Sequence, residues 1–167
     1  MGPPDLYDLA ADLLAAAEEA LNTVPSYAPA LGGAPERSFV APGPVVLDCC
    51  DQLTVNVSSV TQREIVKGQG VNHVGLAITA ARCVPVPDSR GIPPAVEAMV
   101  AAAEQMNADA WALWVYLHAL VSTDQLFEKC CGVTWGAVTP LQTSGGCGGN
   151  LLTVTVCFDG YDLEFGT

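Results

Sequence analysis

The residues of this chain that could do chemistry are seven cysteines, two histidines and a glycine-rich run near the C-terminus. The densest group is Asp48-Cys49-Cys50-Asp51, whose carboxylates and thiols are of the types that bind metal ions. Successive residues of a strand point to opposite faces, so Asp48 and Cys50 share one side while Cys49 and Asp51 share the other. Because this dispersal breaks up a compact site and the chain has no Cys-x-x-Cys spacing, we expect no bound metal.

The cysteines are odd in number and lie mostly inside apolar runs, which favours buried, reduced thiols. Disulfide scaffolds of secreted proteins usually have even counts in shorter chains. The alternative that stays open is one disulfide between neighbouring strands. The seven residues are Cys49, Cys50, Cys83, Cys130, Cys131, Cys147 and Cys157.

Neither histidine has a recognisable nucleophile as its partner in the sequence, because no serine or cysteine lies in a glycine-flanked nucleophile elbow. His118 follows Trp114 by four residues on an expected helix, so we interpret it as a packing residue, and His73 lies at the end of an expected loop. We expect no catalytic residue and no cofactor. The competing hypothesis is a small acidic cytosolic enzyme or metal protein that uses a histidine with Cys49, Cys83 and Cys157.

The glycine-rich run from Gly145 to Asn150 invites comparison with a phosphate-binding loop. Such loops follow a strand and open a helix, and the commonest one ends in Lys-Ser or Lys-Thr. This run lies between two expected strands and has neither ending. We therefore interpret it as a hairpin tip, whose functional role would be close contact with another subunit.

The charge balance excludes several classes of partner. The chain has 18 acidic and 6 basic residues and a formal net charge of -12, and such a surface repels phosphate backbones and anionic membranes. No apolar run is long enough to span a membrane, and no basic region precedes the apolar part of the N-terminus. We expect a soluble protein without an export signal that binds neither membrane nor specific nucleic acid sequences.

The apolar periodicities predict an α+β fold in one domain over residues 1–167, with a single, largely antiparallel sheet of four strands flanked by two helices. Asp5 caps the first helix, and the connection at about 24–44 is expected to be irregular. The second helix is long enough for a break near Asn107 to Asp109. The expected elements are a helix at 5–21, strands at 45–60 and 74–86, a helix from 93 or 94 to 121, and strands at 130–138 and 151–158.

Five motifs in this order resemble the tail terminator proteins of long-tailed phages that infect actinobacteria. The resemblance covers the chain from about Leu6 to Phe158. Its motifs are moderately specific individually and stronger in combination. They are Leu47 to Leu53, Arg82 to Asp88 leading to Gly91 and Pro94, Asp109-Ala110, Gly145-Gly146-x-Gly148-Gly149, and Thr153 to Val156.

The resemblance implies a virion protein without catalytic residues that forms a homohexameric ring on the head-proximal end of the tail tube. Such a ring stops polymerisation of the tail tube protein and offers a docking surface to the head-tail connector, while DNA passes through without specific binding. Other connector, stopper or tail tube proteins remain alternatives. We expect the subunit and tube contacts at a polar hairpin tip between residues 61 and 72, at the turn from Asp88 to Gly91 and at the glycine-rich tip, with Arg82 as a further partner for acidic neighbours. The predicted contact residues are Arg63, Glu64, Lys67, Asp88, Arg90, Gly145, Gly146, Gly148, Gly149 and Asn150.

Overall fold

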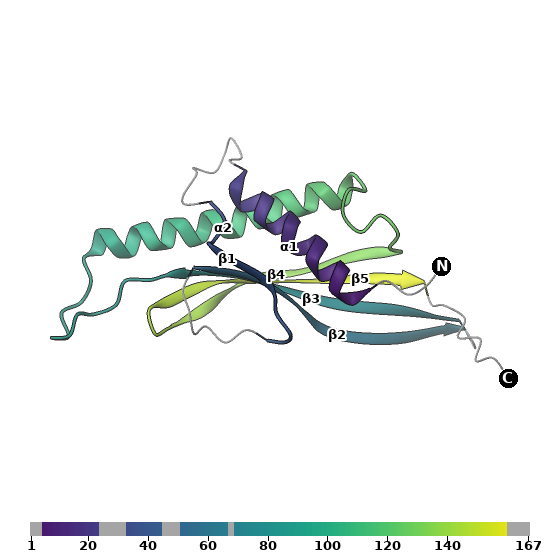
Figure 1. Cartoon of the computed structure of the whole chain (residues 1–167), viewed down its shortest axis with the longest axis horizontal. Helices are drawn as coiled ribbons and strands as arrows, with labels where there is room; N and C mark the ends of the chain where they lie inside the picture. The colour runs from purple at the N-terminus through teal and green to yellow at the C-terminus, as the bar shows by residue number, and fades with distance from the viewer. Residues whose placement is uncertain (1–4, 24–32, 45–50, 67–68, 160–167) are drawn as a thin grey trace.

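The computed structural model describes residues 5–23, 33–44, 51–66 and 69–159 of the 167-residue chain. They form a five-stranded sheet in the order β1-β2-β3-β5-β4, with both helices on one face (Figure 1). The α+β class is therefore confirmed, although the sheet has one strand more than predicted. The elements are α1 (Leu6–Asn22), β1 (Arg37–Val40), β2 (Gln52–Val66), β3 (Gln69–Cys83), α2 (Val96–Ser122), β4 (Gly132–Ser144) and β5 (Cys147–Asp159).

The additional strand, β1, lies in the connection that we expected to be irregular. Its four residues pair in parallel with the start of β2, from Arg37 opposite Gln52 to Val40 opposite Val55. All other pairings in the sheet are antiparallel, so the sheet is mixed. A four-residue strand carries too little periodicity to be read from sequence, which is why this prediction was wrong.

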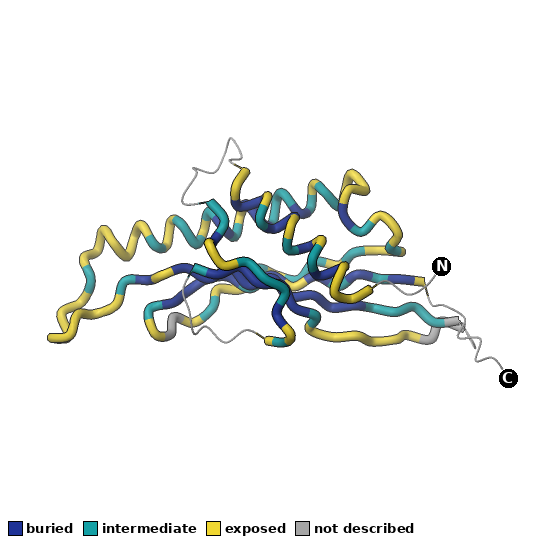
Figure 2. The backbone as a smooth tube through the Cα atoms, in the orientation of Figure 1, coloured by how far each residue is buried: buried dark blue, intermediate teal, exposed yellow. Residues whose placement is uncertain are grey.

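The first helix has the predicted cap. The carboxylate of Asp5 accepts a hydrogen bond from the Tyr7 amide at 2.8 Å, which satisfies one of the free donors at the helix start. Its inward residues include Leu9, Leu13 and Ala17, which pack over β1 and β2 in the core between helices and sheet (Figure 2). Asn22 ends the helix, and its side-chain oxygen accepts a hydrogen bond from the Ala34 amide at 2.9 Å.

The β2–β3 hairpin has no long polar tip. The ladder continues from Gln52 opposite Ala81 as far as Val66 opposite Gln69, so most of the segment expected to form the tip is paired strand. Arg63 is exposed on β2, and the backbone of Glu64 pairs with Gly70. Lys67 lies outside the described residues.

The β4–β5 hairpin turns on only two residues. Gly145 and Gly146 have φ angles of 58° and 81°, as expected for a two-residue turn of the type that matches strand twist. The other members of the predicted glycine-rich tip, Gly148 to Asn150, are buried inside β5 opposite β3. They are paired strand residues rather than tip residues.

The second helix, α2, runs for 27 residues without a break. Asn107 and Asp109, which we interpreted as signals for recapping, lie in its middle. The Asp109 carboxylate does not cap a new helix segment because it is bound to Arg82 across the fold. The helix contains no stretch long and apolar enough to cross a membrane, and neither does the other helix among the described residues.

The prediction of buried, reduced thiols is wrong for Cys131, Cys147 and Cys157, which are disulfide-bonded, while Cys83 and Cys130 are reduced but not buried. The alternative of one disulfide between neighbouring strands is right only in part, because more than one disulfide is present. Cys131 forms a disulfide with Cys157. Cys131 directly precedes β4, and its amide donates to the carbonyl of Cys157 on the neighbouring strand β5 at 2.8 Å, so the two side chains meet across adjacent strands.

Candidate functional site

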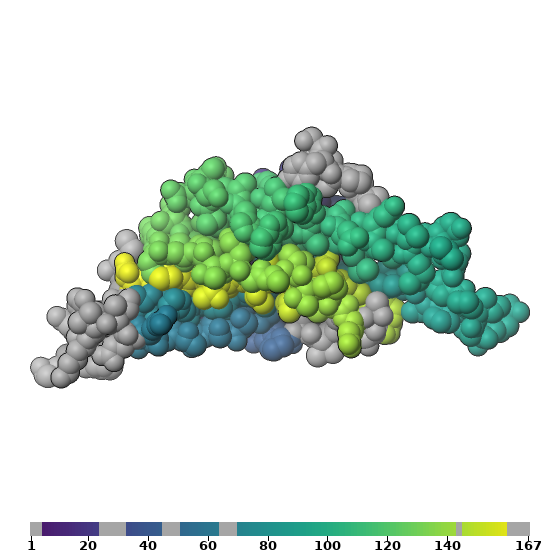
Figure 3. Space-filling model, turned by 180° about the vertical axis from the view of Figure 1, so that it is seen from behind, coloured from purple at the N-terminus to yellow at the C-terminus, as the bar shows by residue number. Residues whose placement is uncertain are grey.

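The most unusual surface is a projection that we name the arm, residues 84–106. The chain leaves the sheet after Cys83, turns at residues 88–91 and returns as the first three turns of α2, beyond the end of the sheet (Figures 1 and 3). The first three turns of α2 are mostly alanine, valine and methionine, with Glu97 and Glu104 as their charged residues, yet they are largely exposed. Contiguous exposed apolar surface of this kind marks an interaction site. The large apolar side chains exposed on the arm are Val86 (57%), Ile92 (55%), Val96 (72%), Met99 (42%) and Val100 (49%).

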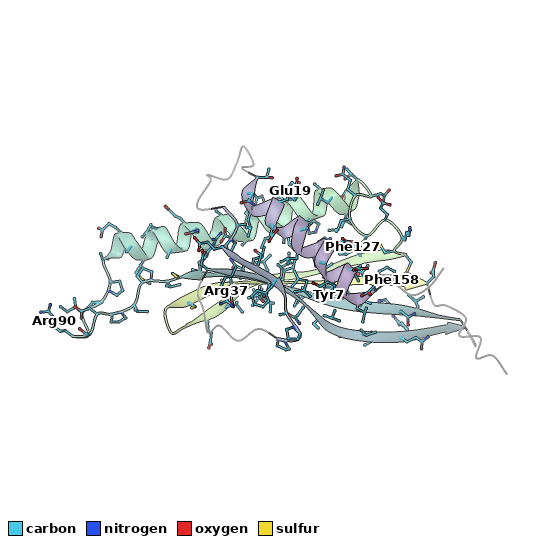
Figure 4. The ribbon with its side chains drawn as sticks, in the orientation of Figure 1. Tyr7, Glu19, Arg37, Arg90, Phe127 and Phe158 are labelled. Carbon is cyan, nitrogen blue, oxygen red and sulfur yellow. A yellow bond between two sulfur atoms is a disulfide. The ribbon has the colours of Figure 1, made fainter. Side chains whose placement is uncertain are left out.

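The tip of the arm is held by its own hydrogen bonds. The Asp88 carboxylate accepts from the amides of Arg90 at 2.8 Å and Ile92 at 2.9 Å, and the Gly91 amide donates to the Asp88 carbonyl at 2.9 Å. Gly91 has a φ of 78°, which a side chain would strain. Asp88 therefore shapes the turn, while the side chain of Arg90 is exposed (Figure 4).

The base of the arm is closed by a buried ion pair. Arg82, the last buried residue of β3, binds Asp109 on α2 through two hydrogen bonds, Nε to Oδ2 at 2.7 Å and Nη2 to Oδ1 at 3.1 Å. A second acidic partner is Asp51, whose Oδ1 lies 2.9 Å from Nη1, and Nη2 also donates to the Gly33 carbonyl. Arg82 and Asp109 are only 5% and 4% exposed. Two parallel bonds between planar groups fix direction as well as distance, so this pair sets the angle at which α2 crosses the sheet.

The electrostatics of this base are those of one cation shared by two carboxylates. Burial raises the pKa of the Asp109 carboxyl, and the charge of Asp51 raises it further, while the hydrogen bonds from Arg82 act in the opposite direction. Burial alone would lower the pKa of Arg82, but Asp109 and Asp51 outweigh it and raise that pKa. Arg82 is therefore charged at any working pH, and Asp109 depends on it for its only buried cationic partner among the described residues.

A further hydrogen bond anchors the helix beside the ion pair. The side-chain amide of Asn150 on β5 donates to the Met106 carbonyl at 2.7 Å, one helical turn before Asp109. On the other limb of the arm, the Val84 amide donates to the Gly146 carbonyl at 2.7 Å. Both limbs are therefore tied to the body where they leave it, and the arm projects from a fixed base.

These contacts correct the predicted roles of several residues. Arg82 is bound within its own chain and is not exposed to a neighbour. Asn150 is buried against α2, and Gly149 packs so closely on β3 that a Cβ atom there would lie 2.0 Å from the Ala80 carbonyl oxygen. Gly148 is buried in the same strand.

Away from the arm lies a cleft of about 560 Å³ between α1 and the connection from α2 to β4. Its wall is apolar, with Leu9, Leu126, Phe127 and Phe158, and Figure 4 shows the two phenylalanines and Glu19 well away from Arg90 at the tip of the arm. Its rim carries three carboxylates and one ammonium group. The lining residues are Leu9, Asp12, Ala15, Ala16, Glu19, Leu120, Gln125, Leu126, Phe127, Glu128, Lys129 and Phe158.

The cleft is shaped by a constrained loop. Phe127 has a φ of 63° and Asp124 a φ of 53°, and a positive φ is a costly conformation for a bulky residue such as phenylalanine. The loop ends at Cys131, whose disulfide to Cys157 fastens it beside Phe158. Residues held in such conformations cluster at binding sites, where the surroundings impose them.

Neither histidine is placed for catalysis with a cysteine that the structure describes, while Asp48, Cys49 and Cys50 lie outside the described residues. His118 lies between Trp114 and Trp135, with ring centroids 4.2 and 4.5 Å away, and its Nδ1 lies 2.6 Å from the Trp114 carbonyl oxygen, which confirms its packing role. His73 stands on β3 opposite Cys157, which is bound in the disulfide. Across the described ranges, no three His, Cys, Asp or Glu side chains gather as metal ligands would.

The predicted contact residues therefore fall in separate places. Arg90 and Asp88 stand on the arm, Gly145 is exposed at a hairpin turn with Gly146 half-buried beside it, and Arg63 lies on the β2–β3 hairpin, which extends away from the arm (Figure 1). Sequence reasoning missed the cleft, because its residues come from three distant segments. Neither protein-family models nor curated protein sequences match this chain.

Proposed function

We propose that this protein is a structural component of a phage tail, a terminator that caps the head-proximal end of the tail tube as a ring. The observation that carries the proposal is the arm, since a run of exposed apolar side chains on an anchored projection has a use in assembly and none in a free monomer. The family resemblance of the sequence motifs supplies the particular assembly, including the hexameric ring and the head connector as a second partner.

End-capping requires one surface that matches the tube and another that does not. The outer edge of β4 has no neighbouring strand in the described part of the chain, and β2 beyond Val55 is likewise unpaired on its outer side. Such edges accept strands of another chain. On this proposal an open strand edge engages the last ring of tube subunits, while the excess of acidic residues, 18 against 6 basic, lets DNA pass through the ring without binding, because like charges repel.

The disulfide agrees with this assignment. Disulfides persist in oxidising environments, among which are virion surfaces. The Cys131–Cys157 bond would thus be kept in a released particle, where it holds the connection between α2 and β4.

The test is to add the purified protein to growing tubes of the tail tube protein and measure tube lengths by negative-stain electron microscopy. A terminator shortens the tubes and leaves a ring at one end only. An Ile92→Asp variant should lose this effect, whereas Val60→Asp, a matched change at an apolar residue of nearly equal exposure (55% and 56%), compares the arm with the β2–β3 hairpin. Tubes of unchanged length with wild-type protein would overturn the proposal, and filaments of the protein alone would indicate a tube subunit instead.

A further inference from the structure

The cleft described above requires a particular kind of occupant. Its wall is formed by Leu126, Phe127 and Phe158, which favours an apolar insertion, and its rim bears Asp12, Glu19 and Glu128 against the single cation Lys129. Glu19 also binds the hydroxyl of Tyr116 on α2, a contact that adds to burial in raising the pKa of that phenol. The occupant that fits is therefore a short apolar segment that carries a positive charge.

The arm tip offers such a segment. It also carries Asp88, but that carboxylate is turned to the amides of Arg90 and Ile92 within the tip, which leaves the Arg90 guanidinium as the charge available to a partner. Val86 and Ile92 are exposed apolar residues that flank the turn, and Arg90 is exposed between them. Most other cations of the described chain are engaged or placed elsewhere. Arg82 is buried with Asp109, Arg37 lies over the Phe39 ring at 5.6 Å, and Lys129 belongs to the cleft rim itself.

A chain cannot fill its own cleft with its own arm. The first turns of α2 belong to the arm, and Leu120 near the other end of the same helix lines the cleft. A straight helix of 27 residues is ~40 Å long, at about 1.5 Å per residue. The tip thus precedes the start of α2 and the cleft lies toward the C-terminal end of that helix, and Figure 4 shows Arg90 far from Phe127.

We propose that the arm tip of one copy inserts into the cleft of the next copy, with Arg90 facing the carboxylates of Asp12, Glu19 and Glu128. The contact is head-to-tail, so each copy uses two unlike surfaces and the chain of contacts closes into a ring when the rotation permits. Both surfaces are preformed, the tip by the Asp88 turn and the cleft by the Cys131–Cys157 bond, which reduces the ordering cost of association. This inference rests on the proposed function only for the ring it would build.

The test compares two exposed arginines. Arg90→Glu and Arg63→Glu make the same charge change, one on the arm and one on the β2–β3 hairpin that the sequence also suggested as a contact. Sedimentation velocity over a concentration series should show self-association of the wild type and of Arg63→Glu. Arg90→Glu should weaken it roughly 30-fold or more, the loss expected when one partner of an interfacial charge pair is removed. Adding Glu128→Lys to Arg90→Glu should restore part of the affinity.

A mixing experiment tests the head-to-tail geometry. Ile92→Asp blocks the arm and leaves the cleft intact, while Ala15→Trp fills the cleft from the exposed side of α1 and leaves the arm intact. Each variant alone should be monomeric, and their mixture should form dimers and nothing larger. Circular dichroism verifies that both variants are folded.

The inference is overturned by a wild type that stays monomeric at every concentration, by equal losses in Arg63→Glu and Arg90→Glu, or by a mixture that forms no dimer. The inference and the proposed function can fail independently. Head-to-tail association without any effect on tail tubes would refute the terminator role alone. Capping of tubes by Arg90→Glu at wild-type strength, with its self-association unchanged, would refute the arm contact alone.

Discussion

Replacing Arg82 by methionine should destabilise the whole fold through the base of the arm. The substitution removes two hydrogen bonds from Asp109, which is 4% exposed, and leaves its carboxylate without the guanidinium. Breaking a buried ion pair from one side typically costs about 3 to 5 kcal/mol, because the remaining charge is desolvated and uncompensated. We expect a loss in this range from the free energy of unfolding.

Three further variants divide that loss among its causes. Arg82→Lys keeps the charge but cannot form parallel bonds to both oxygens of Asp109, so about half the loss should remain. Asp51→Asn should cost less than about 1 kcal/mol, since the Asp51 side chain is 42% exposed and water screens its charge. The double variant Arg82→Met/Asp109→Leu should recover most of the stability, because no charge is then left buried.

The assay is urea unfolding at neutral pH, followed by tryptophan fluorescence. Trp114 and Trp135 flank His118 where α2 meets β4, so their emission reports the packing of the helix on the sheet. Amide hydrogen exchange locates the effect, and protection in α2 near Met106 should fall most in Arg82→Met. A loss below about 1 kcal/mol in Arg82→Met, or a double variant no more stable than the single one, would refute the role assigned to this pair.

The remaining predictions concern pH, packing and the disulfide. Burial holds the pKa of Asp109 above its unfolded value, so the contribution of this carboxyl to stability is present at low pH and lost as the pH rises through the folded pKa. The loss of stability in Arg82→Met should therefore shrink as the solution is acidified from pH 7. The same urea titration measures it. Gly149→Ala should lower the free energy of unfolding by about 1 to 3 kcal/mol, because the new Cβ would strike the Ala80 carbonyl. The control is Gly132→Ala, whose Cβ would meet nothing within 4 Å and should change that free energy by less than about 0.5 kcal/mol. Equal effects in a thermal unfolding experiment would contradict the packing argument. Cys131→Ser should lower the free energy of unfolding by about 3.5 kcal/mol, from the loop closed across 26 residues, and a variant with the wild-type denaturation midpoint would argue against that role of the bond.

Local signals predicted the local structure well. Asp5 and the leucine spacing that follows it act within a single helix and its cap. Both the cap and the buried face of α1 follow from these signals. The alternation of β-branched residues likewise placed strands in the right order. What failed were features that depend on partners far along the chain, such as the pairing of β1 with β2 and the continuation of the β2–β3 ladder.

The candidate surfaces illustrate the same limit. Arg82 and Asp109 are 27 positions apart and each looks like an ordinary surface charge in sequence, so their pairing becomes visible only when β3 and α2 are placed together. The apolar spacing of α2 predicts a helix beside the sheet, but periodicity cannot tell that the sheet ends before the helix does. The turn around Asp88, by contrast, was predicted from Pro, Asp and Gly alone.

The unbroken length of α2 gives the proposed ring a molecular ruler. The helix α2 connects the arm tip of a subunit to the cleft of the same subunit, so the number of residues between Ile92 and Leu120 would set the angle between successive copies. Deleting a single residue from the middle of that helix would swing the projecting end by about 100° around the helix axis. The number of copies in the closed circle would then change, or the circle would open into a spiral.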